Sequence, residues 1–473
     1  MAAAFILEET TRFTVKGIGA VLRRARRPDF PFVALFVGYP LWWILGLSQL
    51  AFLIAAIPLA VQLVRRKTVR VPRGFGVWLC FLVWMILSAS MLEFRFERFV
   101  AFGYRAALYF SATIFFLWVY NMPQRMLPFD RILRLMLAFW FVALGGGYLG
   151  VLLGDVQLTS VTESLLPGAL KTSDFVVSLV RPKFAQVQVF LGFDLNRPAA
   201  PFLFTNQWGA NVALLTPLAL AAWSRMRGIK GRLLMPLAVA ALTVPAIVSV
   251  NRGLWLSLFV AGVYATFRRA QAGQRKKALQ ILGAFVIVAG MVVFTPLFGL
   301  VQGRAESDHA NESRSALYVA VIESVDESPF FGFGAPKSNE ENPNLPAVGT
   351  HGHFWTVLFS QGIPGVVLYV GFLGMMAVRT ARDLTPERLW LHVTFSLLLV
   401  QMWFYNMLPA PLHIGFIVLA ALLRPDRSPP ETEAAAVLVN DDLHFDARDE
   451  NDFSGGAYGQ DDEDAEESME VWV

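Results

Sequence analysis

The sequence predicts an all-α polytopic membrane protein with about twelve transmembrane helices. Apolar residues make up 55% of the chain and charged residues only 16%, with a mean hydropathy of +0.51, a composition typical of helical membrane proteins. The apolar runs have the length of a membrane helix, about 20 residues, and lack the alternation of a β-barrel strand. Clusters of Lys and Arg between the runs indicate cytoplasmic loops and not nucleic-acid binding.

The first half of the chain predicts a basic cytoplasmic N-terminus, residues 1–30, followed by five spans. The cluster Arg23–Arg27 places the N-terminus inside by the positive-inside rule. No cleavable signal peptide is evident, because polar residues directly follow the short apolar stretch near the start. The fifth span contains Gly145–Gly150, whose small residues predict close approach of a neighbouring helix. The five spans are expected at 31–46, 49–64, 75–92, 99–119 and 135–153.

The second half predicts seven spans and two larger extracytoplasmic loops, 154–205 and 300–350. Basic clusters alternate with the spans in agreement with the positive-inside rule, so both termini are expected in the cytoplasm. The transmembrane domain therefore extends over residues 31–424. Its last seven spans are expected at 208–223, 233–250, 254–267, 279–299, 354–376, 389–407 and 411–423.

Residues 425–473 predict an acidic, disordered cytoplasmic tail. This segment contains sixteen Asp and Glu residues against only Arg427 and Arg448, and it is too poor in apolar residues to form a core. A simple solvated tail is one interpretation. The alternative is a docking site for a basic cytoplasmic protein partner.

One arginine is predicted inside a membrane span. Arg105 lies about two turns into the fourth span, where a charge is costly unless it is paired or reaches the interface. It can extend toward the outer interface or pair with Glu97. The sharper hypothesis is that Arg105 binds an anionic lipid headgroup.

Polar residues at the outer ends of spans give the candidate site. Arg252 and Gly253 follow an apolar span, and the planar guanidinium of arginine matches phosphate oxygens, although an interfacial anchor is the simpler interpretation. His351 and His353 lie where the second loop enters a span, and histidine has a pKa of about 6.5, suited to a general base. Their spacing of two residues is awkward for a metal site; a structural pair is the other alternative.

Three segments together resemble the O-antigen ligase and O-antigen polymerase superfamily, whose members transfer lipid-linked glycans. Val250–Trp255 resembles the family's Ser-Arg-Gly motif, with Asn251 in place of Ser. Arg314–Tyr318, followed by the Pro-x-x-Gly-x-Gly turn at Pro329–Gly334, resembles the outer-loop pattern. The sequence from His351 to Gly365 resembles the His-Asn-x-Phe through Gly-Ile-x-Gly signature, with Gly352 in place of Asn. A weaker similarity, an Arg followed by Pro-Asn, occurs at Arg197 and 205–207.

The resemblance implies a GT-C-like helical bundle and a glycosyltransferase at the extracytoplasmic face of the cell inner membrane. Its donor would be a polyprenyl-pyrophosphate-linked glycan and its acceptor a lipid or glycan. Carried over to this chain, it gives His351 as the general base and Arg252 and Arg314 as ligands of the pyrophosphate. Direct displacement requires neither a cofactor nor a metal ion.

Further residues of the same outer side are candidates for substrate binding: Arg197, His353, Arg304, Arg105 and Trp355. The aromatic residues Phe354, Trp355 and Trp208 can stack on sugar rings, although packing at the membrane interface is the simpler interpretation.

Two other classes of function compete with the enzyme. A membrane transporter or flippase of lipid-linked glycans would favour internal repeats and ionisable residues at mid-membrane. A scaffold protein would act through the acidic tail. The clustering of the candidate residues at the outer ends of the spans favours the enzyme, a ligase or a polymerase.

Overall fold

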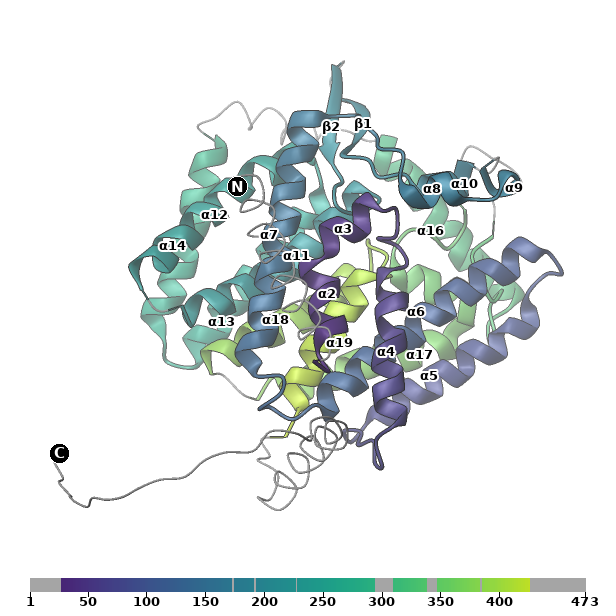
Figure 1. The fold of residues 1–473 in the computed structure, drawn as a ribbon, viewed down its shortest axis with the longest axis horizontal. Coiled ribbons are helices and arrows are strands. Elements are labelled where there is room, and N and C mark those ends of the chain that lie inside the picture. Colours follow the sequence, from purple (N-terminus) through teal and green to yellow (C-terminus); the bar gives the residue numbers. More distant parts are fainter. Residues whose placement is uncertain are drawn as a thin grey trace, which may run out of the picture. The chain divides into compact units, whose positions relative to one another are not determined.

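The computed structural model describes the main body of the chain, shown in Figure 1. The described residues are 27–171, 174–190, 193–226, 228–293, 309–337, 347–382 and 385–425. The acidic segment 426–473 lies outside the described residues, as do residues 1–26 and Arg304. The predictions made for those residues stay predictions.

A helix lies in each range in which a span was predicted. From the N-terminus the helices are α2 (Phe30–Val37), α3 (Tyr39–Ile44), α4 (Ala51–Val64), α5 (Phe75–Leu87), α6 (Phe96–Asn121), α7 (Phe129–Leu153), α11 (Thr205–Ser224), α12 (Ile229–Val248), α13 (Arg252–Gln271), α14 (Arg275–Val293), α17 (His353–Thr380), α18 (Pro386–Gln401) and α19 (Ala410–Leu423). The span predicted at 389–407 was too long, because α18 ends at Gln401. A helix α16 (His309–Glu327) precedes α17 within the second predicted loop.

The first predicted span is divided into two helices. Gly38 separates α2 from α3, and Pro40 occupies the first turn of α3. A proline disfavours the helical conformation of the residue before it and fits the start of a helix. The prediction of one continuous helix over 31–46 was therefore wrong.

Three helices are long and apolar enough to cross a membrane by length and composition. They are α6, α7 and α17, and four shorter apolar helices accompany them within the described residues, at Ala51–Val64, Phe75–Met91, Leu233–Val248 and Ala410–Leu423. The fold class, a mostly helical polytopic membrane protein, agrees with these observations. The number of twelve spans stays a prediction.

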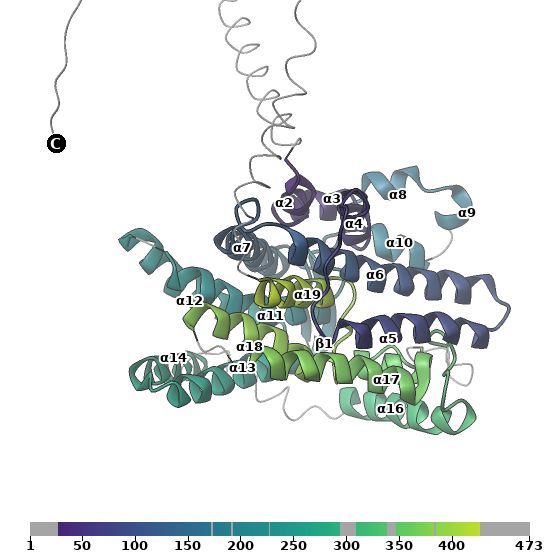
Figure 2. The ribbon, with the colours of Figure 1, turned by 90° about the horizontal axis from the view of Figure 1, so that it is seen from below.

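Helix α19 lies in the centre of the bundle. Every side chain from Ala410 to Leu422 is buried, and α19 contacts α6, α11, α17 and α18. A helix that is apolar on all sides is suited to such a position, because each face has a protein neighbour. Figure 2 shows α19 between α6 and α18, with α5 and α17 side by side.

The first larger loop, residues 154–205, has secondary structure of its own. It contains short helices α8 (Val161–Leu165), α9 (Gly168–Lys171) and α10 (Asp174–Val180). An antiparallel hairpin follows, with β1 (Ala185–Phe190) paired to β2 (Phe193–Pro198) in the register Gln188 opposite Leu195. This hairpin was not predicted, although Ala185–Phe190 alternates polar and apolar residues as half-exposed strands do.

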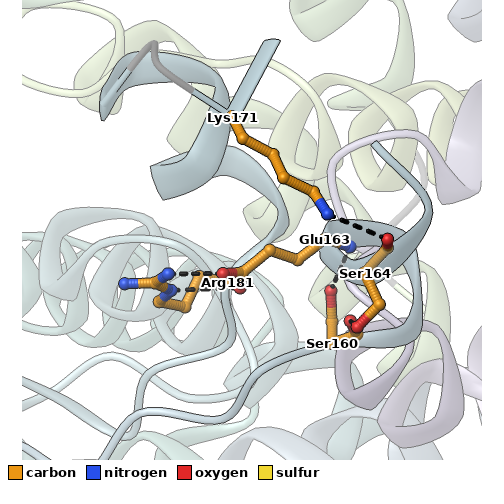
Figure 3. Close-up of polar contacts among 5 residues, drawn as sticks. All are labelled: Ser160, Glu163, Ser164, Lys171 and Arg181. Carbon is orange, nitrogen blue, oxygen red and sulfur yellow. Dashed lines mark hydrogen bonds and ion pairs between the residues drawn. The ribbon is translucent and has the colours of Figure 1, made fainter. Parts of the chain in front are cut away.

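Polar contacts fix the short helices of this loop, as Figure 3 shows. The Arg181 guanidinium donates from Nε to Glu163 Oε2 at 3.0 Å and pairs with Oε1 as well. Ser160 caps α8 by accepting a hydrogen bond from the Glu163 backbone at 3.0 Å. Lys171 Nζ donates to the Ser164 carbonyl at 3.0 Å. The guanidinium lowers the pKa of the Glu163 carboxyl below its ordinary value.

The glycines of α7 allow the close approach that their sequence predicted. A Cβ on Gly146 would lie 2.3 Å from the Ala200 carbonyl oxygen, and one on Gly147 would lie 2.7 Å from the Trp208 ring. Gly150 similarly faces the Phe184 carbonyl, at 2.7 Å. The glycines of α7 therefore pack against the base of the hairpin and against α11.

Candidate functional site

A cavity of about 190 Å³ brings two of the candidate arginines together. Arg197 enters it from β2 and Arg252 from the first residue of α13. Two aromatic side chains enter from the turn between α18 and α19, which we call the 402–409 turn. The cavity is lined by Arg197, Asn206, Val250, Asn251, Arg252, Gly253, Leu256, Phe404 and Tyr405.

The backbone before Arg252 has an unusual conformation. Val250 has a φ of 48°, in the left-handed region that a β-branched residue rarely adopts. Asn251 then caps α13, because its side chain accepts a hydrogen bond from the Leu254 N–H at 3.3 Å. Asparagine, like serine, is a favoured N-cap residue, so its presence in the Ser position of the motif retains the cap. This turn therefore places Arg252 at the first position of α13, where it lines the cavity.

Two of the hydrogen bonds of Arg197 go to uncharged acceptors. Its Nε donates to the Ser249 carbonyl at 2.7 Å, and a terminal nitrogen donates to Gln188 Oε1 at 2.6 Å. The first bond ties β2 to the residue just before the Val250 turn. The weak similarity at Arg197 thus pointed to a residue of the cavity, and the hairpin places it beside Arg252.

His351 lies at the entrance to α17 and is half-buried. The Thr350 hydroxyl donates to the Ala347 carbonyl at 2.6 Å and lies 3.2 Å from His351 Nδ1. Because the hydroxyl proton is directed to Ala347, its oxygen accepts from Nδ1, an assignment made from the hydrogen-bond network. This tautomer puts the lone pair of the neutral ring on Nε2.

Gly352, which follows His351, is required by the backbone. Its φ is 82°, and a Cβ there would lie 2.5 Å from the Trp403 carbonyl oxygen. An asparagine at this position would meet both the strain and the clash. Gly352, which stands where the motif has Asn, therefore allows the 402–409 turn to lie close to the start of α17.

His353 is fully buried, two residues after His351. Its Nε2 lies 2.9 Å from the Tyr109 hydroxyl of α6, and its Nδ1 lies 3.2 Å from Asn406 Oδ1. Asn406 Oδ1 also accepts from the Leu408 N–H at 3.0 Å, which identifies this atom as the amide oxygen. The Met407 N–H also donates to Nδ1, at 3.4 Å, so both ring nitrogens are hydrogen-bonded, Nδ1 to the 402–409 turn and Nε2 to α6. His353 is bonded within the protein and does not line the cavity.

The 402–409 turn connects the two histidines with the cavity. The N–H of His353 donates to the Tyr405 carbonyl and that of Phe354 to the Met402 carbonyl, both at 2.8 Å, so the turn caps α17. On its other side the Tyr405 hydroxyl donates to Asn251 Oδ1 at 2.5 Å. Sequence reasoning missed this turn.

The candidate aromatic residues have different environments. Trp355 stacks on Tyr318 of α16 with ring centroids 4.6 Å apart, and its indole donates to the Trp403 carbonyl at 3.2 Å. Phe354 stacks on Trp403 at 4.2 Å. Trp208 is fully buried and donates to the Ala143 carbonyl at 2.9 Å. Packing thus explains Trp208, while Trp355 and Trp403 form an aromatic cluster beside His351.

Arg105 does not pair with Glu97 in the described structure. Its guanidinium donates to the Ala101 carbonyl, one turn nearer the predicted outer end of α6, at 3.3 Å, and Glu97 is exposed. The ion-pair interpretation was therefore wrong, and the direction of the side chain agrees with extension toward the interface.

The remaining two arginines are not placed in the cavity. Arg314 belongs to α16, but its side chain, like the whole of Arg304, lies outside the described part of the chain.

Two of the motifs form one joint. In the Pro-x-x-Gly-x-Gly turn, the N–H groups of Phe333 and Gly334 donate to the carbonyls of Phe359 and Ser360, each at 2.9 Å. In return the Ile363 N–H donates to the Pro329 carbonyl at 2.8 Å. These bonds require the helix to open, and it does so at Gly362, where φ is 66° and ψ is −169°.

Side chains of α5 and α6 hold this joint. Arg98 donates to the Phe333 carbonyl at 2.9 Å and to the Pro336 carbonyl at 2.5 Å. The Trp84 indole donates to the Gln361 carbonyl at 2.9 Å, and its ring stacks on Phe331 at 4.8 Å. The end of α16 is therefore fixed to the same helices that carry Tyr109 and His353.

The protein is a mostly helical bundle with apolar helices of membrane length, as membrane proteins have. Its cavity is lined by Arg197 of the hairpin and Arg252 at the start of α13, and two guanidinium groups suit an anion. Residues 237–370 match the family model described as O-Antigen ligase. This match supports the resemblance to the O-antigen ligase and polymerase superfamily predicted from the motifs, and the matched residues include Arg252, Arg314 and His351. No curated protein and no solved structure matched the chain. The family supports an enzyme of the O-antigen ligase type in polysaccharide biosynthesis.

Proposed function

We propose that this protein is a glycosyltransferase that moves an oligosaccharide or polysaccharide from a polyprenyl-pyrophosphate donor to a lipid or glycan acceptor. The reaction takes place at the extracytoplasmic face of the inner membrane, with both chain termini in the cytoplasm. The observation that carries this proposal is the cavity that joins Arg197 to Arg252, next to a turn whose other side caps the helix start following His351.

The arginines suit the leaving group of this reaction. Breaking the bond between sugar and phosphate places negative charge on the polyprenyl pyrophosphate. A guanidinium offers paired donors to phosphate oxygens, and donors fixed before the reaction stabilise developing charge most effectively. Arg197 is fixed by Ser249 and Gln188, and Arg252 by its position at the start of α13, whose N-terminus also favours an anion.

His351 acts as the general base in this proposal. Its Nε2 takes the proton of the acceptor hydroxyl while that oxygen forms a bond to the anomeric carbon. The bond from this carbon to the pyrophosphate oxygen breaks at the same time, and the leaving group keeps the electron pair. This direct displacement inverts the anomeric centre, and the proton on His351 later passes to water. Thr350 holds the ring in the tautomer that this role requires.

The other candidates have supporting roles in the proposal. Arg314 and Arg304 contribute charge to the pyrophosphate from the loop before α17, and Arg105 binds a phosphate near the outer end of α6. Trp355, in the aromatic cluster beside His351, provides a surface for sugar rings. The reaction needs no metal ion or cofactor, and the acidic tail serves a cytoplasmic protein partner.

The test uses the purified full-length protein in proteoliposomes with a synthetic polyprenyl-pyrophosphate oligosaccharide, candidate acceptors and EDTA. The variants are His351→Ala and Arg252→Ala. Matched controls are His444→Ala in the C-terminal segment and Arg382→Ala, which is exposed at the opposite end of α17. We expect transfer by the wild type and the controls, and a loss of at least about 100-fold in both site variants.

Each result decides between the hypotheses. Wild-type-like transfer by both site variants would exclude the assigned roles of His351 and Arg252. Movement of the donor across the bilayer without glycan transfer would favour the transporter. Activity that disappears with EDTA and returns with a divalent cation would contradict a metal-independent reaction.

A further inference from the structure

The buried residue His353 has no role in the proposed chemistry, yet it lies between the two halves of the site. It is fully buried, while a polar side chain in such a position is tolerated only when its hydrogen bonds are made. Both of its ring nitrogens have partners, and the partners come from different elements: Tyr109 from α6 and Asn406 from the 402–409 turn. The histidine therefore joins three elements at one point.

The contacts continue without interruption from His353 to the cavity. The His353 N–H donates to the Tyr405 carbonyl at 2.8 Å. The side chain of Tyr405 extends to the other side of the turn and donates to Asn251 Oδ1 at 2.5 Å. Asn251 caps α13 and directly precedes Arg252. A chain of hydrogen bonds thus connects α6 and the start of α17 with the arginine of the cavity.

The packing around this chain leaves it little freedom to shift. A Cβ on Gly253 would lie 2.7 Å from the Tyr405 hydroxyl oxygen, and one on Gly209 would lie 2.3 Å from Asn251 Nδ2. Asn251 Nδ2 also donates to the Thr205 carbonyl of α11 at 3.2 Å. Because close-packed elements transmit small displacements, a change at His353 is expected to move the aromatic wall of the cavity.

We propose that His353, bonded to Tyr109 and Asn406, is a positioning residue that fixes the distance between the base His351 and the Arg252 cavity through the 402–409 turn. The proposal rests on the proposed transferase function. His353 neither takes a proton nor touches the substrate. Its function is to hold His351, on the acceptor side, at a fixed position relative to Arg252, on the donor side. Misplacement by about 1 Å can lower a rate about 100-fold.

The test measures transfer kinetics of Tyr109→Phe and Tyr405→Phe, each of which removes only one hydroxyl from the chain. Tyr148→Phe is the matched control, because it removes a similar hydroxyl bond, to the Ala241 carbonyl at 2.7 Å, between α7 and α12. We expect kcat to fall about 10-fold or more in each of the first two variants, with the KM for donor within about threefold of wild type. The control is expected to keep the wild-type kcat.

The double variant distinguishes positioning from separate structural damage. If both tyrosines act through one chain, their combined effect on kcat will be well below the product of the single effects. Multiplicative effects, or single variants with wild-type kcat, would overturn the proposal. So would losses that match the fraction of misfolded protein in gel filtration. A wild type without any transfer would instead refute the proposed function, and the two failures are therefore distinct.

Discussion

Two arginines of the same predicted outer loop show how differently one residue type is used. Arg181, beside the short helices, donates to both oxygens of Glu163, so its partly exposed charge is matched by a buried carboxylate. Arg197, on the hairpin, is anchored by a backbone carbonyl and an amide oxygen, neither of which carries charge. The first arrangement fastens a loop. The second positions a guanidinium at a cavity.

The difference shows that the anchor of an arginine is more informative than its location. Both side chains lie in the first larger loop, and both are partly exposed. A carboxylate partner satisfies the positive charge and the donor geometry together. The two uncharged acceptors of Arg197 fix the geometry of its guanidinium without themselves adding negative charge.

The largest expected effect separates these two arginines by activity. Arg197→Ala is expected to lower glycan transfer by about 100-fold, because one fixed donor to the leaving group is lost. Arg181→Ala is expected to leave the rate per folded molecule unchanged. Initial rates at saturating donor, normalised to folded protein, measure both. Equal losses in the two variants would contradict the comparison.

A second expectation concerns the seat of the hairpin that carries Arg197. Gly146→Ala places a methyl group 2.3 Å from the Ala200 carbonyl, and such overpacking should destabilise the protein by about 1–3 kcal/mol. Gly145→Ala is the control, because nothing lies within 4 Å of its added Cβ. Thermal unfolding in detergent compares them, and an unchanged Tm for Gly146→Ala would show that α7 and the hairpin are not tightly seated.

A smaller effect is expected when the charge in the cavity is kept but its shape is changed. Arg252→Lys retains a positive charge and loses the planar fork of donors. We expect kcat/KM for the donor to fall about tenfold, which corresponds to about 1.4 kcal/mol. Steady-state kinetics at several donor concentrations test this. A full loss of activity would show that charge alone contributes little, and an unchanged rate would show that the paired geometry is unnecessary.

The smallest effect is expected for the ion pair of Arg181. The pKa of Glu163 is lowered in the folded protein, so the pair stabilises above the ordinary carboxyl pKa and this contribution disappears as pH falls through the lowered value. Glu163→Gln should therefore reduce stability at pH 7 by less than about 1 kcal/mol. The difference from wild type should vanish at acidic pH in melting experiments. A difference that grows on acidification would show that folding raises the pKa of Glu163 and does not lower it.

The positions of the helices could be predicted from the sequence because burial in lipid or protein selects apolar runs of helix length. The same signal says nothing of breaks within a run, so the division at Gly38 and the opening at Gly362 were not foreseen. The hairpin at 185–198 was not predicted, because six residues of alternating pattern give a weak signal within the larger loop 154–205. The motifs did identify Arg252 and Arg197, which share the cavity.

The 402–409 turn could not have been found in this way. Residues 402–407 are apolar enough to have been predicted as the end of the span 389–407, whereas α18 ends at Gln401. Its contribution comes from backbone carbonyls at Met402 and Tyr405 and from the amide of Asn406, and these depend on close approach of segments far apart in the chain. Likewise, spacing alone could not show that His353 faces the interior while His351 lies at the helix entrance.

The joint between the Pro-x-x-Gly-x-Gly turn and α17 has a consequence for how such chains can change in evolution. A Cβ on Gly332 would lie 2.4 Å from the Phe359 carbonyl oxygen, and one on Gly362 would lie 2.4 Å from the Phe330 carbonyl oxygen. Neither glycine can acquire a side chain unless the opposite backbone retreats. We therefore expect the two positions to be inherited as a pair, so that relatives lacking one glycine also lack the other.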